Sequence, residues 1–453
     1  MKFYIETHGC YKNRVDSEVI VSLLEKHHRI TNNPKLADVI IINTCTFVEK
    51  ATMESIETIL RLAKLKGIKL IVIGCLGQRY ANDIMKEIPE VDAVIGTYGF
   101  NKIEGVLERV MKSEKIIEVK KPALSYPIDY IQRRLFAPSH YAYIKISDGC
   151  NRRCSFCIIP ELKGNLRSRG IESIIKEAET LVRKGVKEII LIAQDTTAYG
   201  LDIYGKKRLS NLLCCLSKID GLKWLRLLYN YPGEVDDKLL ELIASDPKIC
   251  KYLDIPIQHI SDSILRRMRR EISGKKVRKT IMKIRKRYPE IFLRTTIIAG
   301  FPGEREEDFL ELCQFIKDVR FERLGVFTYS REDGTESFNM KRQIPRKIKE
   351  EREEKIMEIQ SKISLEINKD FIGKTVPVII DERIGGKFQY DGRTEFDAPE
   401  IDNGVLITRG NFSLGDIVHV KIKDATEYDL IGGIEKDSRG KVAAPFNPVR
   451  NFF

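Results

Sequence analysis

The stretch Ser147-Asp-Gly-Cys-Asn-Arg-Arg-Cys-Ser-Phe-Cys-Ile158 is the one from which the fold of this chain can be argued. It places Cys150, Cys154 and Cys157 in a C-x3-C-x2-C spacing, so three neighbouring thiolates could hold three irons of one cubane cluster. A complete cluster normally takes four thiolates, and no fourth cysteine lies nearby in the sequence. One iron would therefore keep an open position, which is what a catalytic metal site needs.

The same three thiols could instead hold zinc, or a cluster that only transfers electrons. Zinc sites favour a cysteine pair combined with a distant second pair or with histidines, and the nearest histidine here is His140. The run resembles the signature of radical S-adenosylmethionine (SAM) enzymes. That resemblance implies that SAM chelates the open iron, and that Phe156, the aromatic residue just before the third cysteine, lies near its adenine.

Composition and charge narrow the class of protein. The 453 residues are enough for two to four domains, and no apolar run approaches the ~18 residues of a membrane-spanning helix. The N-terminus lacks the apolar segment of a signal peptide, so we expect a cytoplasmic protein with no membrane partner. The net charge of +13 would suit a polyanionic partner, but a lysine-rich solvated surface explains it equally simply.

The first ~110 residues alternate between apolar strands and helical patterns, which predicts a parallel sheet covered on both faces. Three successive strands end at Cys10, Cys45 and Cys75, and a fourth ends near Thr97. Because the carboxyl ends of parallel strands meet at one edge, these thiols predict a second cluster site with its own open position. The alternative is three buried core thiols, a common place for free cysteine.

The other four cysteines lack this arrangement, and we interpret them as packing residues. They are Cys214, Cys215, Cys250 and Cys313.

Beyond a proline-containing connection at about 105–139, strands and helices alternate six more times. This predicts a partial parallel barrel with the C-x3-C-x2-C loop after its first strand, on the catalytic face. The expected strands are Tyr141–Ser147, Glu188–Ala193, Leu222–Tyr229, Tyr252–Pro256, Phe292–Ala299 and Leu324–Tyr329.

Polar residues at the other strand ends are candidate SAM contacts, namely Gln194, Asp195, Gln258, Gly300 and Glu304. Gly300–Glu304 could equally be a turn that opens a helix with acidic residues, as the helix dipole favours. His259 could simply hydrogen-bond the backbone. The basic run Arg266–Arg270 is either a solvated helix face or a contact for an acidic loop.

Cys10, Cys45 and Cys75 ahead of a radical SAM core resemble the methylthiotransferase family over nearly the whole chain, and most closely its RimO-type branch. The matching stretches are Lys12–Glu18, Gly74–Tyr80, Ala193–Gly200 and Asp397–Asp402. One departure is Tyr11, where RimO-type chains usually carry proline.

The resemblance implies an α/β architecture: an N-terminal parallel sheet domain (1–112), a linker (113–135), a partial (β/α)6 radical SAM barrel (136–366), a small antiparallel β-barrel called a TRAM domain (368–434) and a tail (435–453). It implies two 4Fe-4S clusters, at Cys10, Cys45 and Cys75 and at Cys150, Cys154 and Cys157. The implied reaction uses two SAM to add a methylthio group to the β-carbon of an aspartate of ribosomal protein S-twelve. Electron and sulfur donors are implied partners.

The nearest rival is a tRNA methylthiotransferase acting on a modified adenosine beside the anticodon. Residues 373–434 hold seven Lys and Arg against eleven Asp and Glu, a net charge of −4. Because phosphate contacts dominate nucleic-acid affinity, such a domain should repel tRNA and attract a basic ribosomal protein. The alternative explanation of this charge is an acidic surface that binds no partner.

Overall fold

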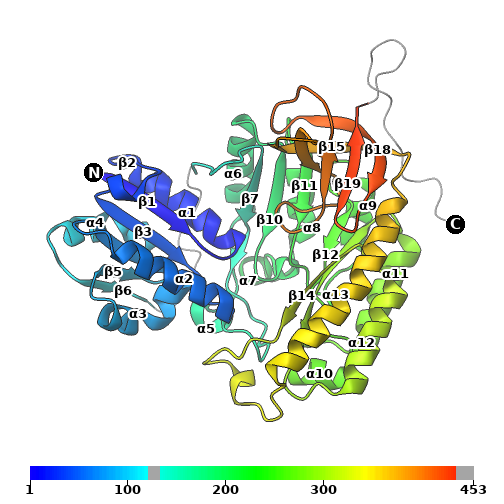
Figure 1. Cartoon of the computed structure of the whole chain (residues 1–453), viewed down its shortest axis with the longest axis horizontal. Coiled ribbons are helices and arrows are strands. Elements are labelled where there is room, and N and C mark those ends of the chain that lie inside the picture. The colour runs from blue at the N-terminus through cyan, green and yellow to red at the C-terminus, as the bar shows by residue number, and fades with distance from the viewer. Residues whose placement is uncertain (121–132, 435–453) are drawn as a thin grey trace.

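The computed structural model describes residues 1–120 and 133–434, which form three bodies joined along the chain (Figure 1). An N-terminal α/β unit lies beside a central half-barrel, and a small β-barrel caps one end of that half-barrel (Figure 1). Residues 121–132 of the expected linker and the expected tail lie outside the described residues. None of the described helices is long and apolar enough to cross a membrane.

The N-terminal unit is a six-stranded parallel sheet in the order β2-β1-β3-β4-β5-β6. Its central strand β3 reads Val-Ile-Ile-Ile-Asn-Thr and is buried throughout, as expected for a strand covered on both faces. One face packs on α1 and α4, and the other on α2 and α3. The strands are β1 (Lys2–Thr7), β2 (Arg29–Ile30), β3 (Val39–Thr44), β4 (Lys69–Gly74), β5 (Val91–Ile95) and β6 (Ile116–Glu118). The helices are α1 (Tyr11–Leu24), α2 (Glu49–Ala63), α3 (Cys75–Glu87) and α4 (Ile103–Met111).

The predicted parallel sheet is confirmed, with two local differences. The first helix begins at Tyr11, directly after Cys10, whereas its helical sequence pattern predicts a start at about Asp16. The sheet also gains β6, which extends it to Glu118 inside the segment expected to be a linker. Three residues are too short a run to carry a strand pattern of their own, so pairing with β5 decides this edge.

The central unit is the predicted half-barrel of six parallel strands, built from two three-stranded sheets in the orders β11-β10-β7 and β12-β13-β14. Along β13 the residues alternate between half-buried and buried, as expected when one face borders an interior and the other packs on helices. The strands are β7 (Tyr141–Lys145), β10 (Glu188–Ile192), β11 (Trp224–Leu227), β12 (Tyr252–Asp254), β13 (Phe292–Ala299) and β14 (Arg323–Thr328). A two-stranded ribbon adds β8 (Ser147–Asp148) and β9 (Arg167–Ser168).

Helices cover the outside of the half-barrel, and the long α13 crosses β14 on its way to the C-terminal barrel (Figure 1). They are α5 (Ile159–Lys163), α6 (Ile171–Arg183), α7 (Leu201–Tyr204), α8 (Leu209–Leu216), α9 (Asp237–Ser245), α10 (Asp262–Arg267), α11 (Gly274–Arg287), α12 (Glu306–Val319) and α13 (Arg346–Lys369).

The C-terminal unit is a closed five-stranded barrel in the order β15-β16-β17-β19-β18. A turn that contains Gly385 and Gly386 connects its first two strands, and Gly386 has a φ of +86°. The strands are β15 (Thr375–Arg383), β16 (Tyr390–Arg393), β17 (Gly404–Ile407), β18 (Ile417–Ala425) and β19 (Asp429–Gly433).

The C-terminal barrel closes the amino-terminal end of the half-barrel, and we call its closing segment, 394–403, the floor segment. Asp397 pairs with Arg323 at the start of β14, and Asp402 pairs with Arg294 of β13. The hydroxyl of Tyr252, the first residue of β12, donates to Asp402 at 2.7 Å. The active face at the opposite, carboxyl end of the strands is therefore the open one.

Candidate functional site

The N-terminal thiols lie together at the carboxyl edge of their sheet, where the sequence predicted them. Cys10 is the N-cap of α1, Cys75 is the first residue of α3, and Cys45 directly follows β3. Two of the three thiols therefore stand at helix N-termini, where the helix dipole stabilises negative charge. Cys45 and Cys75 are buried, whereas Cys10 is exposed.

A left-handed glycine precedes Cys10, and Cys45 lies directly against this glycine. Gly9 has a φ of +88°, and a Cβ at this position would lie 2.5 Å from the Cβ and 2.7 Å from the Sγ of Cys45. Only glycine permits both this backbone and this approach. The same Gly-Cys pair with positive φ recurs at Gly74-Cys75 and Gly149-Cys150. The repeated dipeptide is a sequence signal for these sites that the cysteine spacing does not include.

The three N-terminal thiols also interact electrostatically. Burial and the neighbouring Cys10 raise the pKa of Cys45 to about 11. Burial raises the pKa of Cys75 to about 12, with Cys45 and Cys10 adding to the rise and Lys163 opposing it. The free thiols of Cys45 and Cys75 are thus held protonated at neutral pH, and a bound metal would have to displace their protons.

The second trio lies in the loop that follows β7 and β8. Backbone hydrogen bonds shape this loop: Cys150 N donates to Gly164 O, Cys157 N to Cys154 O, and Ser155 N to Met268 O. Burial raises the pKa of Cys150 to about 11 and that of Cys157 to about 12. All three cysteines are partly exposed, unlike typical core residues.

Each trio offers thiol donors alone, and a cluster at either trio stays a prediction. Within residues 1–120 and 133–434, no three His, Cys, Asp or Glu side chains converge closely enough to hold one metal ion. A cubane needs wider spacing, because each thiolate ligates a different iron. The donors are thiolates alone, which is the set that iron–sulfur clusters use.

The loops that carry the two trios touch. Cys75 packs against Ile158 and Leu162, which follow Cys157 closely in the chain. On the same side, the Thr97 hydroxyl donates to Leu162 O at 3.0 Å, and Tyr98 donates to Lys163 O. Cys10 lies close enough to Tyr229, beyond the end of β11, to raise the pKa of that phenol together with burial.

Four buried charges join the N-terminal unit to the base of the second thiol loop. Lys145 Nζ lies 2.5 Å from Asp16 Oδ1 of α1 and 3.4 Å from Asp148 Oδ2. Lys163 lies 3.5 Å from the same oxygen of Asp148 and 3.7 Å from Asp16. Although burial opposes ionisation, the two lysines hold the pKa of Asp148 well below its usual range. Asp148 is two residues before Cys150, so this network fixes one thiol loop against the other unit.

The predicted SAM contacts from the first strands lie around the second thiol loop. Phe156 is edge-on to Phe301 with 6.4 Å between ring centroids. Gln194 donates to Asp148 at 2.8 Å, and Asp195 accepts from Arg152 Nε at 3.2 Å. Gln258 has a φ of +69°, and its buried Oε1 has no hydrogen-bond partner. Their contact with SAM stays a prediction.

Gly300 and Glu304 form a tight turn with local partners. One Glu304 oxygen accepts from the Gly300 and Phe301 N–H groups, and the other accepts from Arg352 of α13 at 2.7 Å. Burial raises the pKa of Glu304 to about 7 despite these donors. His259 accepts from Ser261 N through Nδ1, so it does hydrogen-bond the backbone, and burial lowers its pKa to about 3.

Two residues near the thiols were not predicted from the sequence to lie there. Lys12 Nζ lies 4.3 Å from the centre of the Tyr229 ring and 3.5 Å from Ala193 O. Its charge opposes the rise that burial causes in the pKa of Cys45. No carboxylate of the described residues lies within ion-pair distance of it. Arg270, part of the basic run, directs Nη1 to Cys154 Sγ at 3.8 Å.

Comparison with known proteins agrees with this division of the chain. The uncharacterised protein family UPF0004 matches residues 2–96, the radical SAM superfamily matches 144–316, and the TRAM domain matches 372–434. A similar solved structure is the radical S-adenosylmethionine methyltransferase TsrM from Kitasatospora setae, with cobalamin and a [4Fe-4S] cluster bound. It aligns with a TM-score of 0.56 at 13% identity, covering 86% of this chain and 80% of that one, so the likeness concerns the fold.

The fold and these matches define a radical SAM enzyme that carries a TRAM domain. Similar proteins named ribosomal protein uS12 methylthiotransferase RimO come from a Thermoanaerobacter species and from Caldanaerobacter subterraneus. They are 50% and 51% identical, each over 94% of this chain and 98% of the relative. One from Clostridioides difficile is 44% identical over 96% of this chain and 99% of its own. The chain therefore belongs to the RimO family of radical SAM methylthiotransferases, enzymes that transfer methylthio groups.

Proposed function

We propose that this protein adds a methylthio group to the β-carbon of an aspartate in ribosomal protein uS12, using two 4Fe-4S clusters and two SAM per product. The observation that carries the proposal is the pair of thiol trios on adjoining loops, with Cys75 packed against the residues that follow Cys157. The names of the similar proteins support the choice of substrate.

In this proposal, Cys150, Cys154 and Cys157 hold the cluster that meets SAM, and Cys10, Cys45 and Cys75 hold the auxiliary cluster. When bound, these groups supply a carbon radical and a sulfur carrier, which is chemistry that no side chain provides. A radical is needed because an aspartate β-hydrogen is not acidic enough for general-base removal at neutral pH.

The chain's own residues contribute position and exclusion of water. The Asp16–Lys145–Asp148–Lys163 network holds the two thiol loops against each other. The floor segment covers the opposite end of the half-barrel with buried ion pairs. A carbon radical formed inside would be shielded from water on that side.

Only some of the acidic side chains in residues 373–434 are available to a protein partner. Several acids of residues 373–434 face the rest of the chain: Asp381 contacts His140, Glu400 contacts Arg14, and Asp397 and Asp402 pair with barrel arginines. Part of the net charge of −4 is therefore neutralised internally. Without these four acids, residues 373–434 hold seven Asp and Glu against seven Lys and Arg, so the charge of this domain no longer decides between tRNA and a basic protein.

Two sets of variants test the two-cluster assignment. Replacing Cys150, Cys154 and Cys157 by alanine should abolish cleavage of SAM to 5′-deoxyadenosine. Replacing Cys10, Cys45 and Cys75 should leave some cleavage, abolish methylthio transfer and reduce bound iron from about eight to about four atoms. Methylthio transfer by the second set would refute the assignment.

The substrate is tested in cells that lack this protein. Mass spectrometry of ribosomal-protein peptides and of tRNA nucleosides should find the CH3S mass missing from uS12 alone. Its loss from tRNA instead would favour the tRNA methylthiotransferase and exclude the proposal.

A further inference from the structure

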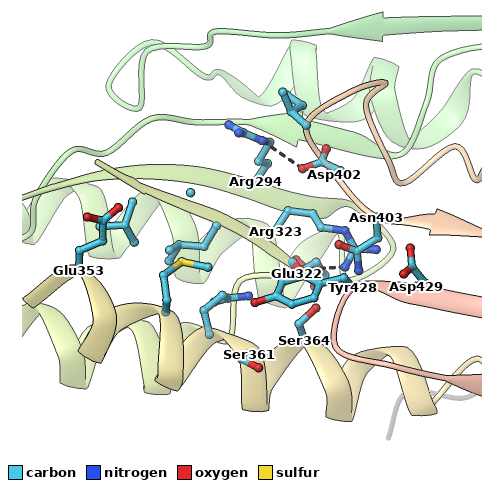
Figure 2. Close-up of a pocket in the computed structure, with 16 residues that line it drawn as sticks. Arg294, Glu322, Arg323, Glu353, Ser361, Ser364, Asp402, Asn403, Tyr428 and Asp429 are labelled. Atoms are coloured by element: carbon cyan, nitrogen blue, oxygen red, sulfur yellow. Dashed lines mark hydrogen bonds and ion pairs between the residues drawn. The ribbon is translucent and has the colours of Figure 1, made fainter. Parts of the chain in front are cut away.

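A groove of about 410 Å³ lies between β14, α13 and the C-terminal barrel, away from both thiol trios. Figure 2 shows it bounded by the α13 helix on one side and by the loops that carry Asn403 and Tyr428 on the other. Glu353 and Asp429 lie toward its opposite ends (Figure 2). Tyr428 and Ile401, both lining it, are 54% and 39% exposed.

One wall of the groove is the free edge of a sheet. Among the described residues β14 pairs with β13 alone, so its other edge has no strand partner. Leu324, Gly325 and Val326 of this edge strand line the groove. An unpaired edge presents N–H and C=O groups to which another extended segment can hydrogen-bond.

The groove also holds amide groups that lack partners. Asn403 is more than nine-tenths buried, and its Nδ2 makes no hydrogen bond. Gln360 of α13 donates to Phe321 O, but its buried Oε1 accepts from nothing. An unsatisfied buried donor and acceptor each cost free energy. The C=O of a peptide unit could accept from the Asn403 amide, and an N–H could donate to the Gln360 carbonyl.

The charge of the groove favours a basic occupant. The arginines that line it are already paired, Arg294 with Asp254 and Asp402 and Arg323 with Asp397. Glu353 is half-buried and faces Glu350 and Glu354, with Lys50 as an attractive neighbour, and the pKa of its carboxyl is raised chiefly by burial. Burial likewise raises the pKa of Asp429. A cation from outside would stabilise both carboxylates.

The groove continues into the half-barrel. A Cβ at Gly325 would lie 3.6 Å from Arg294 Nη2, so this position faces the interior. Phe327, two residues further along β14, faces the same way by strand alternation and is 54% exposed. A segment lying along β14 would run from the groove toward the carboxyl ends of the strands, where the second thiol loop lies.

We propose that this groove binds an extended, basic segment of the substrate protein as an added strand on β14, leading the target residue into the half-barrel. The inference rests on the proposed function, because it takes the substrate to be a ribosomal protein. It is more specific than a general attraction to the C-terminal barrel, because it names the free edge of β14, the groove beside it and the path from that groove into the half-barrel.

The test compares two adjacent glutamates on α13. Glu353 lines the groove, whereas Glu354 is exposed and does not. With reconstituted enzyme and recombinant uS12 as the probe, Glu353→Lys should raise the dissociation constant about tenfold, and Glu354→Lys should change it less than about twofold. SAM cleavage without uS12 checks that both variants are folded and carry clusters.

A second measurement follows the backbone. Hydrogen exchange of the wild-type enzyme with and without uS12 should show slower exchange of amides in Arg323–Thr328 when the complex forms. Tyr428→Ala should weaken binding more than Leu414→Ala, which removes an exposed apolar side chain outside the groove.

The outcomes separate the two proposals. Equal effects of the Glu353 and Glu354 variants, or unchanged exchange along β14 in a complex that forms, would overturn the groove and leave the function standing. Failure of the wild-type enzyme to bind uS12, combined with binding of tRNA, would overturn both.

Discussion

Gly9 is the residue on which the geometry of the N-terminal thiols depends most directly. Its left-handed backbone leads the chain into α1, and its missing side chain leaves room for Cys45 directly beside the residue that precedes Cys10. Gly67 also has a left-handed backbone, with a φ of +79°, but a Cβ there would meet nothing within 4 Å. A comparison of substitutions at Gly9 and Gly67 therefore separates the effect of backbone strain from the effect of crowding at the thiols.

We predict that Gly9→Ala lowers the iron content of the reconstituted protein by about half, because the added Cβ displaces Cys45. Gly67→Ala carries similar strain without the contact and should retain about the full iron content. Iron analysis together with SAM cleavage, which should persist in both variants, provides the measurement. Equal iron in the two variants would mean that the contact at Gly9 does not matter.

Lys12 is the cation nearest the auxiliary thiols that has no acidic partner in the described part of the chain. Under the proposed function, its ammonium group is placed to bind the carboxylate of the target aspartate. A hydrogen bond to a charged group contributes about 1.5–3 kcal/mol, so Lys12→Met should reduce kcat/KM for uS12 by roughly ten- to a hundredfold.

The controls for this variant separate charge from structure. Lys12→Arg should recover part of the activity, and Lys26→Met, at an exposed position after α1, should have no effect. Iron content must stay at the wild-type level for the result to concern the substrate. Wild-type kinetics in iron-replete Lys12→Met would contradict the assignment.

The six cysteines could be chosen from the sequence because their spacing and their places at strand ends are local patterns. The roles of Lys12 and Glu304 could not. Lys12 is distinguished only because no carboxylate of the described residues lies within ion-pair distance of it. Glu304 is distinguished by its ion pair with Arg352, which is 48 residues away in sequence. Both properties depend on which elements pack together.

At the scale of elements, strands β15 and β16 of the C-terminal barrel share a buried chain of charges with strands β10 and β11 of the half-barrel. Arg393 lies 2.8 Å from Glu188 and 2.5 Å from Asp381, and Arg226 lies 2.6 Å from Glu188. The Glu188 and Arg226 side chains are fully buried. The two arginines keep the pKa of Glu188 below its usual value although burial opposes this.

We predict that Arg393→Leu lowers the free energy of unfolding by about 3–5 kcal/mol, because it leaves buried carboxylates short of a partner. Arg346 pairs with Glu350 on the exposed surface of α13, and Arg346→Ala should lower the free energy of unfolding far less than Arg393→Leu does. Urea unfolding followed by circular dichroism compares the two. Similar midpoints would show that the buried chain adds little.

The long strands were predictable because runs such as Val-Ile-Ile-Ile specify a buried strand without help from distant residues. The short elements were not: β6 has three residues, and its pairing with β5 decides it. The start of α1 could not be located from sequence because its N-cap is Cys10, which is not one of the usual capping residues and makes no side-chain cap hydrogen bond. The reason for a tyrosine at position 11 is visible only in the fold. Its hydroxyl donates to Pro399 O, and its ring stacks on Tyr143 with the centroids 4.2 Å apart.

At the scale of the whole molecule, the C-terminal barrel is part of the enzyme's core as well as a candidate substrate contact. Its Ile379 and Ala398 pack into the same apolar cluster as Tyr143, Ile190 and Tyr252 of the half-barrel. Composition could show that residues 373–434 are acidic, but not that several of these acids face inward. That depends on how the domains dock, which no local pattern encodes.

We predict that a chain ending at Asp370 does not fold to an active half-barrel, because Arg226, Arg294 and Arg323 would lose partners and apolar surface would be uncovered. Soluble yield and resistance to limited proteolysis measure this against the full chain. A soluble truncated protein that cleaves SAM at the wild-type rate would contradict it.

The closing of the half-barrel by residues 394–403 also dictates an order of events during synthesis. Domains fold as they leave the ribosome, from the N-terminus onward. The N-terminal sheet, β1 to β6, is translated before the half-barrel, but the half-barrel must wait for a floor segment that is translated after all six of its strands. A nascent chain with its first thiol trio already folded and its second still unsupported would be the species that needs protection, by chaperones or by fast elongation.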